Sequence, residues 1–355
     1  MRLVNSSIFL VVASALAAVA VNNYSPNSSS ALSVSAQEHV ITEKSYILQG
    51  GSAQHLNQLV KQVGGNVSRE FPFINAVSAM LTSTQADKIR KMGGVRVQDD
   101  RTVITSGLLS NALTSIAKQF SINNYIAEQT GANLLHDMDI KGDGVTVAVI
   151  DSGTNMWGEI GASLFRNSKN ERRVPVKYDA FRGHETYYYN DDQNGHGTHV
   201  SGLIASSFKD DEGHFNGIAP DVYLLSVKAF NSEGQSSYSK VLDSLNWIFE
   251  NRYTHKIRVV NMSLGAEVQS YYWDDPINQA VMRLWDAGIV VVSSAGNNGK
   301  DMGITVPGNN PYIITVGAAT DSGTPYDMTD DRLASFSAKG PTLEGFVKPE
   351  VITYG

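Results

Sequence analysis

The chain beyond residue 140 alternates between short, continuously apolar runs and longer segments with one apolar face. The apolar runs are 145–150, 222–227, 258–265, 289–296 and 312–319. Continuous apolar runs are typical of parallel strands that are buried on both faces of a sheet. Segments 239–251 and 276–287 repeat apolar residues at helical spacing, and the second has Pro276 at its start and Gly288 after its end. The alternation predicts an α/β fold built on a parallel sheet.

Residues 44–104 follow a different pattern of short strands and two helices. The helical segments 53–65 and 82–94 each end at a pair of glycines, and Thr82 or Ser83 is suited to be the N-cap of the second. Together with the strands around them, they predict the order β-α-β-β-α-β. This order is typical of a small α+β domain of the split βαβ type. No cluster of catalytic residue types falls within it.

The first residues are predicted to direct export. Arg2 precedes the apolar run Ile8–Val21, which is too short to predict a membrane span but has the length of a signal-peptide core. The pattern Val34-Ser35-Ala36, or an earlier one within ALAAVA (15–20), suits cleavage, and an uncleaved anchor is the alternative. The predicted divisions of the chain are a signal peptide at 1–36, a linker at 37–43, the small domain at 44–104, a junction at 105–122 and the larger domain at 123–355.

The composition of the chain argues against several classes of function. The chain has 355 residues, no cysteine and a formal net charge of −7. The absence of cysteine excludes disulfides, thiolate nucleophiles and Cys-type zinc sites. No long basic stripe is present, so nucleic acid is not an expected partner. A nucleotide-binding site is also disfavoured, because the glycines at 142–144 precede the first predicted strand instead of following it.

Polar clusters stand where several predicted strands end. The first strand ends in Asp151, and the motifs NMSLG (261–265) and SSAGNNG (293–299) close two later strands. The motif NGHGTHVSG (194–202) leads into a predicted helix. Ligands bind beyond the carboxyl ends of the strands in open parallel sheets, so we expect these four clusters to meet at one edge.

Asp151 and His196 are the residue types of a general-base pair. The carboxylate would hold the imidazole in one tautomer and stabilise it when charged. His196 lies between two glycines, where backbone can approach a substrate, whereas His199 lies a turn further on and is expected to pack. Asn297, on a glycine-flanked turn, is suited to donate its amide to a developing oxyanion.

These residues also have structural interpretations. His196 alone could be a hydrogen-bonded core histidine, Asp151 a helix cap and Asn297 a turn residue. A zinc site at His196 and His199 lacks a third ligand in phase.

The acidic stretches are interpreted more simply. The stretches 191–192, 210–212 and 327–331 are expected to be solvated loops. Calcium at Asp330 and Asp331 is the alternative for the last of them, although no ordered ligand spacing supports it.

Taken in order, VTVAVIDSG, NGHGTHVSG, NMSLG and SSAGNNG resemble the motifs of the subtilisin-like serine proteases, peptidase family S8. The likeness runs from about Asn123 to the end and includes PGNNPYIITVGAA and ASFSAKGP. Residues 44–104, with KSYILQ and GGVRVQDD, are similar to the inhibitor I9-type propeptides that precede these proteases. The resemblance implies a secreted proenzyme whose propeptide assists folding and inhibits the enzyme until it is removed.

The resemblance also implies roles for single residues. Asp151 would orient the base, His196 would be the base and Asn297 would help to form the oxyanion hole. The substrate-binding residues that it implies are Ser263, Leu264, Gly265 and Gly234.

The resemblance further implies polypeptide substrates and residues 44–104 as an intramolecular inhibitor. An extended substrate would add a strand to the sheet. By resemblance, Ser263, Leu264 and Gly265 would line the primary specificity pocket, which implies broad tolerance there, large apolar side chains included. No cofactor is expected for the chemistry, structural calcium is common in the family, and no stable membrane association is expected once the signal is removed.

The family's nucleophilic serine stands in a GTS motif, which the 355 residues lack. The SGT strings at 152–154 and 322–324 do not have its context. We therefore expect a form truncated before the serine and without peptidase activity; loss of the nucleophile lowers the rate about 10⁶-fold in a subtilisin, the measured example for this figure. The alternative is a non-catalytic peptide-binding or protease-inhibitory protein, and the gene sequence beyond Gly355 separates the two.

Overall fold

The computed structural model describes residues 42–107, 125–156, 158–174, 176–187 and 191–354. The predicted signal peptide and the cleavage site before residue 37 lie outside the described residues, as does most of the predicted junction at 105–122. Within the described part of the chain, no helix combines the length and the apolar character needed to cross a bilayer.

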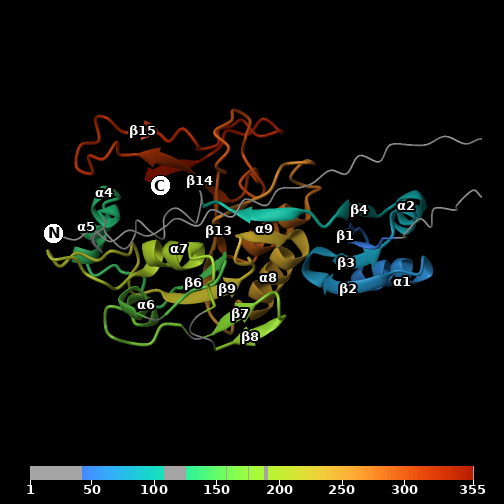
Figure 1. Ribbon diagram of the computed structural model, residues 1–355, viewed down its shortest axis with the longest axis horizontal. Coiled ribbons are helices and arrows are strands. Elements are labelled where there is room, and N and C mark those ends of the chain that lie inside the picture. Colours follow the sequence, from blue (N-terminus) through green and yellow to red (C-terminus); the bar gives the residue numbers. More distant parts are fainter. Residues whose placement is uncertain (1–41, 108–124, 157, 175, 188–190, 355) are drawn as a thin grey trace, which may run out of the picture. The chain divides into compact units, whose positions relative to one another are not determined.

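A nine-stranded, mostly parallel sheet forms the centre of the larger domain (Figure 1). Its strands lie in the order β15-β14-β13-β11-β6-β9-β7-β8, and β16 also pairs with β14. Only the pairs β7–β8 and β14–β15 are antiparallel, so the prediction of a parallel α/β sheet is confirmed. The strands are β6 Thr146–Asp151, β7 Lys177–Asp179, β8 His184–Thr186, β9 Tyr223–Lys228, β11 Ile257–Met262, β13 Val290–Ser294, β14 Ile314–Thr320, β15 Arg332–Leu333 and β16 Val351–Tyr354.

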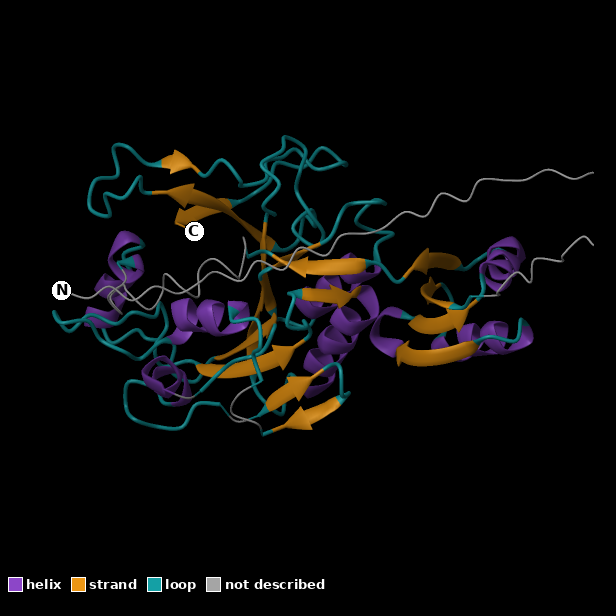
Figure 2. Cartoon of the chain, viewed as in Figure 1, coloured by secondary structure: helices purple, strands orange, loops and turns teal. Residues whose placement is uncertain are grey.

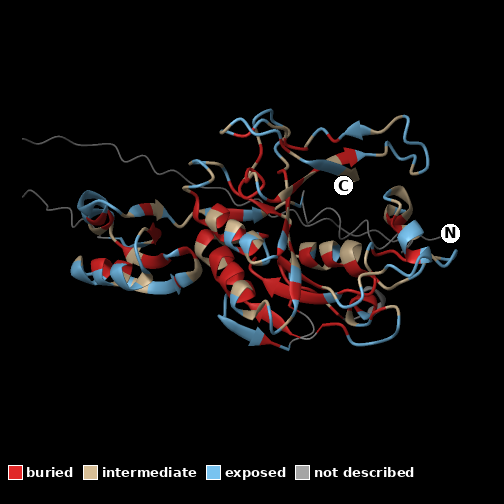
Figure 3. Ribbon diagram, turned by 180° about the vertical axis from the view of Figure 1, so that it is seen from behind, coloured by how far each residue is buried: buried red, intermediate tan, exposed pale blue. Residues whose placement is uncertain are grey.

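Helices cover both faces of this sheet, and the alternation of side chains along β6 shows how. Ala148 and Ile150 pack in one apolar cluster with α8 (Tyr238–Asn251) and α9 (Pro276–Asp286). Val147 and Val149 pack in a second cluster on the other face, with α6 and α7. The bounds of the remaining helices of this domain are α4 Ile126–Gln129, α5 Ala132–Asp137, α6 Gly158–Phe165 and α7 His196–Ala205. Burial on both faces explains why these strands read as continuous apolar runs (Figure 3).

The small domain has the predicted element order (Figure 2). Its four strands form an antiparallel sheet in the order β2-β3-β1-β4, with both helices on one side of the core. Thr82 is the N-cap of the second helix and forms a capping box with Gln85. The elements are β1 Lys44–Gln49, α1 Ala53–Gln62, β2 Asn66–Phe71, a 3₁₀ turn η1 at Pro72–Ile74, β3 Ala76–Leu81, α2 Ser83–Met92 and β4 Arg96–Asp99.

A third sheet joins the two domains. The strand β5 (Thr102–Thr105) lies antiparallel between β10 (Gln235–Ser237) and β12 (Leu264–Gly265). The domain boundary that we predicted at residue 104 therefore falls inside a strand. In addition, the predicted strand 258–265 is divided into β11 and β12, because its last residues leave the central sheet to pair with β5.

Candidate active site

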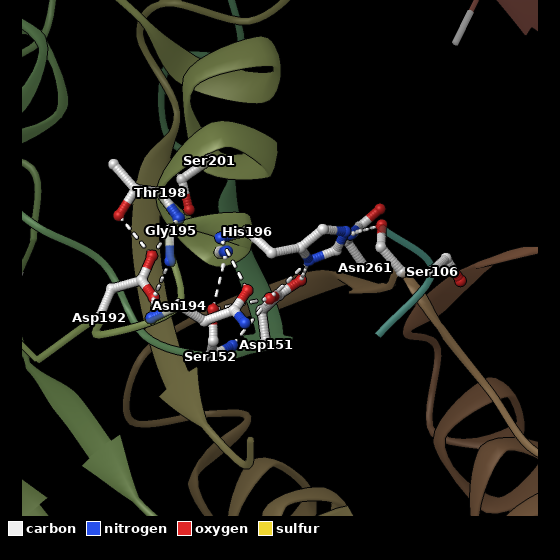
Figure 4. Close-up of polar contacts among 12 residues, drawn as sticks. Ser106, Asp151, Ser152, Asp192, Asn194, Gly195, His196, Thr198, Ser201 and Asn261 are labelled. Carbon is white, nitrogen blue, oxygen red and sulfur yellow. Dashed lines mark hydrogen bonds and ion pairs between the residues drawn. The ribbon is translucent and has the colours of Figure 1, made fainter. Parts of the chain in front are cut away.

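Asp151 and His196 meet at the carboxyl end of the central sheet (Figure 4). Asp151 is the last residue of β6, and its side chain is about 1% exposed. His196 is the first residue of α7, and its Nδ1 atom lies 2.8 Å from Oδ1 and 2.9 Å from Oδ2 of Asp151. The structure therefore brings together the two side chains that we predicted to pair.

Ser152 and Gly197 bring the end of the strand and the start of the helix into contact. Oδ1 of Asp151 accepts hydrogen bonds from the backbone amide and the hydroxyl of Ser152, at 2.7 and 3.2 Å. The same hydroxyl accepts the backbone amide of Gly197 at 2.9 Å. A Cβ atom on Gly197 would lie 2.2 Å from the carbonyl oxygen of Gly153, so only glycine allows this approach.

Asp192 anchors the start of α7, and our expectation of a solvated loop at 191–192 was wrong. The residue is only 6% exposed. One carboxylate oxygen accepts the amides of Asn194 and Gly195, and the other accepts the amide and hydroxyl of Thr198. Gly195, at the N-cap position, has φ of 97° and no side chain with which to cap the helix. The carboxylate of Asp192 therefore does the capping, and it fixes the position of His196.

Two buried lysines, which no sequence pattern predicted, hold the neighbouring backbone. Nζ of Lys177 lies 2.9 Å from the carboxylate of Asp191. Nζ of Lys228 donates to the carbonyl oxygens of Ser152 and Asp191 at 2.6 Å each, which ties the 191–194 loop to the end of β6. Burial lowers the pKa of both lysines against the opposing effect of the nearby aspartates. A buried charge is retained when it is paired in this way.

The two histidines of α7 have opposite electrostatic environments. Burial opposes the charged form of His196, but its hydrogen bond to Asp151 and the charges of Asp151 and Asp192 outweigh burial and raise its pKa above 6.5. Burial, aided by the positive charge of His196, lowers the pKa of His199. Of the two rings, His196 is therefore the better proton acceptor.

Asn297 follows β13 and faces the segment after β5. Its side-chain amide donates a hydrogen bond to the carbonyl oxygen of Ser106. The backbone amide of Ser106 donates to the carbonyl of Ser263 at 2.9 Å. The amide of Thr105 donates to the carbonyl of Gly234 at 3.0 Å. The residues that we predicted to bind a substrate strand thus hold residues 102–106 of this same chain.

No nucleophile faces His196 among the described residues, where no hydroxyl forms a hydrogen bond to its Nε2 atom. The hydroxyls of the two SGT strings are engaged elsewhere: that of Ser152 donates to Asp151, and that of Ser322 donates to the carbonyl of Asp330. Both serines thus have other partners, in agreement with our expectation that neither is the nucleophile.

Acidic groups away from this site have internal partners. Asp330 accepts the hydroxyl of Thr324, and Asp331 accepts the hydroxyl of Tyr354 at 2.6 Å. Neither belongs to a converging group of three possible metal ligands, so calcium at this position remains a prediction. In the described part of the chain, one such group was not predicted: ligand atoms of Glu128, Glu212 and His214 lie within 4.8 Å of one another. In that group, Nδ1 of His214 forms a 2.6 Å ion pair with Glu128.

Comparison with known proteins assigns the larger domain. A family model described as the subtilase family, Peptidase S8, matches residues 142–355. Serine protease AprX of Bacillus subtilis is 35% identical over 224 residues, which are 61% of this chain and 47% of the relative. Subtilisin E of the same species is 29% identical over 321 residues, which are 85% of this chain and 71% of the relative. The chain therefore spans about half the length of AprX.

The fold agrees with this assignment. The crystal structure of fervidolysin from Fervidobacterium pennivorans, a keratinolytic enzyme related to subtilisin, superposes with a TM-score of 0.64 at 23% identity. The alignment covers 89% of this chain and 47% of fervidolysin. With the family model covering more than half of the sequence, the chain belongs to the subtilase family of serine peptidases.

Proposed function

We propose that this chain is part of the proenzyme of a secreted serine endopeptidase, with Asp151 and His196 as two members of its triad and Asn297 in the oxyanion hole. One observation carries the proposal. The carbonyl of Ser106 accepts the amide of Asn297, while the following residue lies against the imidazole whose other side is bound to Asp151. A peptide bond thus lies between an oxyanion donor and a general base.

The chemistry follows from these positions. A serine hydroxyl, supplied by a segment that the 355 residues do not include, attacks the carbonyl carbon and gives its proton to Nε2 of His196. The carbonyl oxygen becomes the oxyanion, which the amide of Asn297 stabilises. His196 then gives the proton to the leaving amine, and the acyl group stays on the serine. Water then gives a proton to the same imidazole and attacks the ester, and the imidazole passes that proton to the serine oxygen as the acid is released.

The proposal assigns residues 44–104 and the strand that follows them as an intramolecular inhibitor. β5 occupies the position of a substrate strand, and the bond that faces the base joins Ser106 to Gly107. A Cβ atom on Gly107 would lie 2.7 Å from Cδ2 of His196, so glycine lets the chain pass the ring. Ser106–Gly107 is therefore the bond that we assign to maturation.

Charged contacts support the docking of the small domain on α8 and α9. The carboxylate of Asp100 accepts the backbone amide and the hydroxyl of Ser239, in the first turn of α8. Arg101 forms a 2.9 Å ion pair with Asp275, the N-cap of α9. The small domain thus supplies an acceptor at the start of α8 and a charge pair at the start of α9. Such contacts would stabilise these two helices during folding.

Secretion is part of the same proposal. The apolar run Ile8–Val21 has the length of a signal-peptide core. A relative with 28% identity over 205 residues is named minor extracellular protease Epr of Bacillus subtilis. The proposed substrates are extracellular polypeptides, and nucleic acids and membranes are not proposed partners.

The decisive experiment restores a nucleophile. The chain is extended after Gly355 by the segment of subtilisin E that carries the GTS serine, and casein hydrolysis is measured. We expect activity in the extended chain and its loss when His196 is replaced by alanine or when the added serine is replaced by alanine. Casein hydrolysis that survives His196→Ala would contradict the assignment of the base.

The absence of a GTS motif favours one alternative, a non-catalytic inhibitory protein of the same descent. Both proposals predict that a peptide of residues 44–104 inhibits a subtilisin-type enzyme, and extension to residue 107 should strengthen inhibition by completing β5 and adding Ser106. Absence of inhibition at micromolar concentration would count against the inhibitor role. Activity of the extended chain separates the two proposals, because a protein of purely inhibitory function need not retain a working base and oxyanion hole.

A further inference from the structure

Ser106 contacts two backbone segments, 263–265 and 294–297: its amide donates to Ser263, its hydroxyl lies against that of Ser294 and its carbonyl accepts from Asn297. We call these two segments the walls of the pocket. The hydroxyl oxygens of Ser106 and Ser294 lie 2.7 Å apart. Ser294 also donates to the carbonyl of Leu264 at 3.2 Å, so its hydroxyl bridges the two walls. Under the function proposed above, this pocket receives the residue that precedes the cleaved bond.

Thr305 fills the space between the same two walls. A Cβ atom on Gly265 would lie 2.8 Å from Oγ1 of Thr305, and one on Gly296 would lie 2.8 Å from its Cγ2 atom. The pocket walls thus lack side chains where Thr305 occupies the gap. A side chain that reaches further than that of Ser106 would have to displace the threonine.

The position of Thr305 is fixed by its neighbours. Its backbone amide donates to the carbonyl of Ala295 at 3.0 Å, and its hydroxyl donates to the same oxygen at 3.3 Å. The next residue, Val306, exchanges two backbone hydrogen bonds with Ala266, at 2.9 and 3.1 Å. Because threonine is also stiff at χ1, it has little freedom to swing out of the gap.

We propose that Thr305 and Ser294 restrict this pocket to small side chains, with serine favoured, so that the substrates are peptide bonds that follow small residues. Thr305 sets the size limit, and the hydroxyl of Ser294 provides a hydrogen-bond partner for a serine at this position. The inference rests on the proposed function, and it replaces the tolerance of large apolar side chains that the family resemblance implied.

The size limit is tested in the full chain by a double-mutant cycle that needs no catalysis. Ser106→Leu, Thr305→Ala and the double variant are compared with the unchanged protein by amide hydrogen exchange. The reporters are the amides of Thr105 and Ser106, which bind Gly234 and Ser263 in the cleft. Amides of β6 report global unfolding, and exchange at the two reporters is normalised to them.

We expect Ser106→Leu to reduce protection of the two amides about 10- to 100-fold, since side chains too large for a packed site are displaced or strained. In the Thr305→Ala background, which removes the two atoms that fill the gap, the same leucine should change protection by less than about threefold. Unchanged protection in Ser106→Leu, or a loss that Thr305→Ala does not reverse, would overturn the size limit.

The hydroxyl preference has its own cycle, with Ser106→Ala and Ser294→Ala. Each single variant should reduce protection about three- to tenfold, and the double variant should lose no more than either single one, because both remove the same hydrogen bond. Additive losses would overturn the preference for serine. If the two reporter amides exchange freely in the unchanged chain while β6 is protected, the segment does not occupy the cleft. That result would contradict the proposed inhibitor role, and with it the inference about specificity.

Discussion

Nδ1 of His196 lies within 2.9 Å of both carboxylate oxygens of Asp151, although 45 residues separate them in the sequence. The pair is buried, and Asp151 is held in turn by the amide and hydroxyl of Ser152. Nδ1 is thus directed to the carboxylate, which leaves Nε2 as the ring atom that can take a proton from a nucleophile.

Replacement of Asp151 by asparagine should lower the pKa of His196. The variant keeps a hydrogen-bond acceptor but removes the negative charge that stabilises the imidazolium, while burial continues to oppose it. We expect the pKa of His196, which lies above 6.5 in the unchanged protein, to fall, because burial then acts without the opposing carboxylate charge. The measurement is an NMR titration of the imidazole in the full chain, with Asp139→Asn, at an exposed carboxylate, as control. Equal pKa values in wild type and Asp151→Asn would contradict the electrostatic role of the pair.

The raised pKa of His196 should also make stability depend on pH. The folded protein binds this proton more tightly than the unfolded chain, so the stabilisation is fully present below about pH 6.5 and is lost as the pH rises through the folded pKa. His196→Gln should therefore cost more stability at about pH 6 than at about pH 9 in urea unfolding. His199, whose pKa is lowered, has the opposite sign and acts below about pH 6.5. A pH-independent cost of His196→Gln would show that the linkage is absent.

Replacement of Asp192 by alanine should loosen the start of α7. Two backbone amides before the helix, together with the amide and hydroxyl of Thr198, lose their common acceptor. We expect the free energy of unfolding to fall by about 3 kcal/mol. Asp192→Asn should cost less, because its one carbonyl oxygen still accepts the amides of Asn194 and Gly195. Denaturant unfolding gives the energies, and equal losses in the two variants would argue against capping by the carboxylate.

The parts of the fold that follow from a local pattern were predictable. The strand β6 is a continuous apolar run and α8 repeats apolar residues at helical spacing. Since the ends of parallel strands fall on one edge, the meeting of Asp151 with the helix of His196 followed from the topology. The same reasoning placed Asn297 near them. Each of these predictions uses residues within a single element together with one general rule of sheets.

Two features were not predicted because they depend on residues that are far apart in the sequence. Asp191 read as part of a solvated loop because its partners are distant: Lys177 lies 14 residues before it and Lys228 lies 37 residues after it, on separate strands of the sheet. β5 has four residues, too few for a strand pattern, and it pairs with strands more than 130 residues away. Burial and pairing of this kind depend on tertiary contacts that no short window of sequence contains.

Replacement of Asn297 by alanine in the chain extended with a GTS serine should lower kcat and leave KM nearly unchanged, because the amide meets full negative charge only in the transition state. The expected loss is about 10²–10³-fold, a figure whose measured example is the oxyanion-hole asparagine of a subtilisin. Asn298→Ala is the matched control, since that exposed side chain donates to Gly303 in a turn and faces no substrate. Both kcat and KM are measured by steady-state kinetics on a peptide substrate. A kcat within about threefold of the unsubstituted extended chain would remove Asn297 from the oxyanion hole.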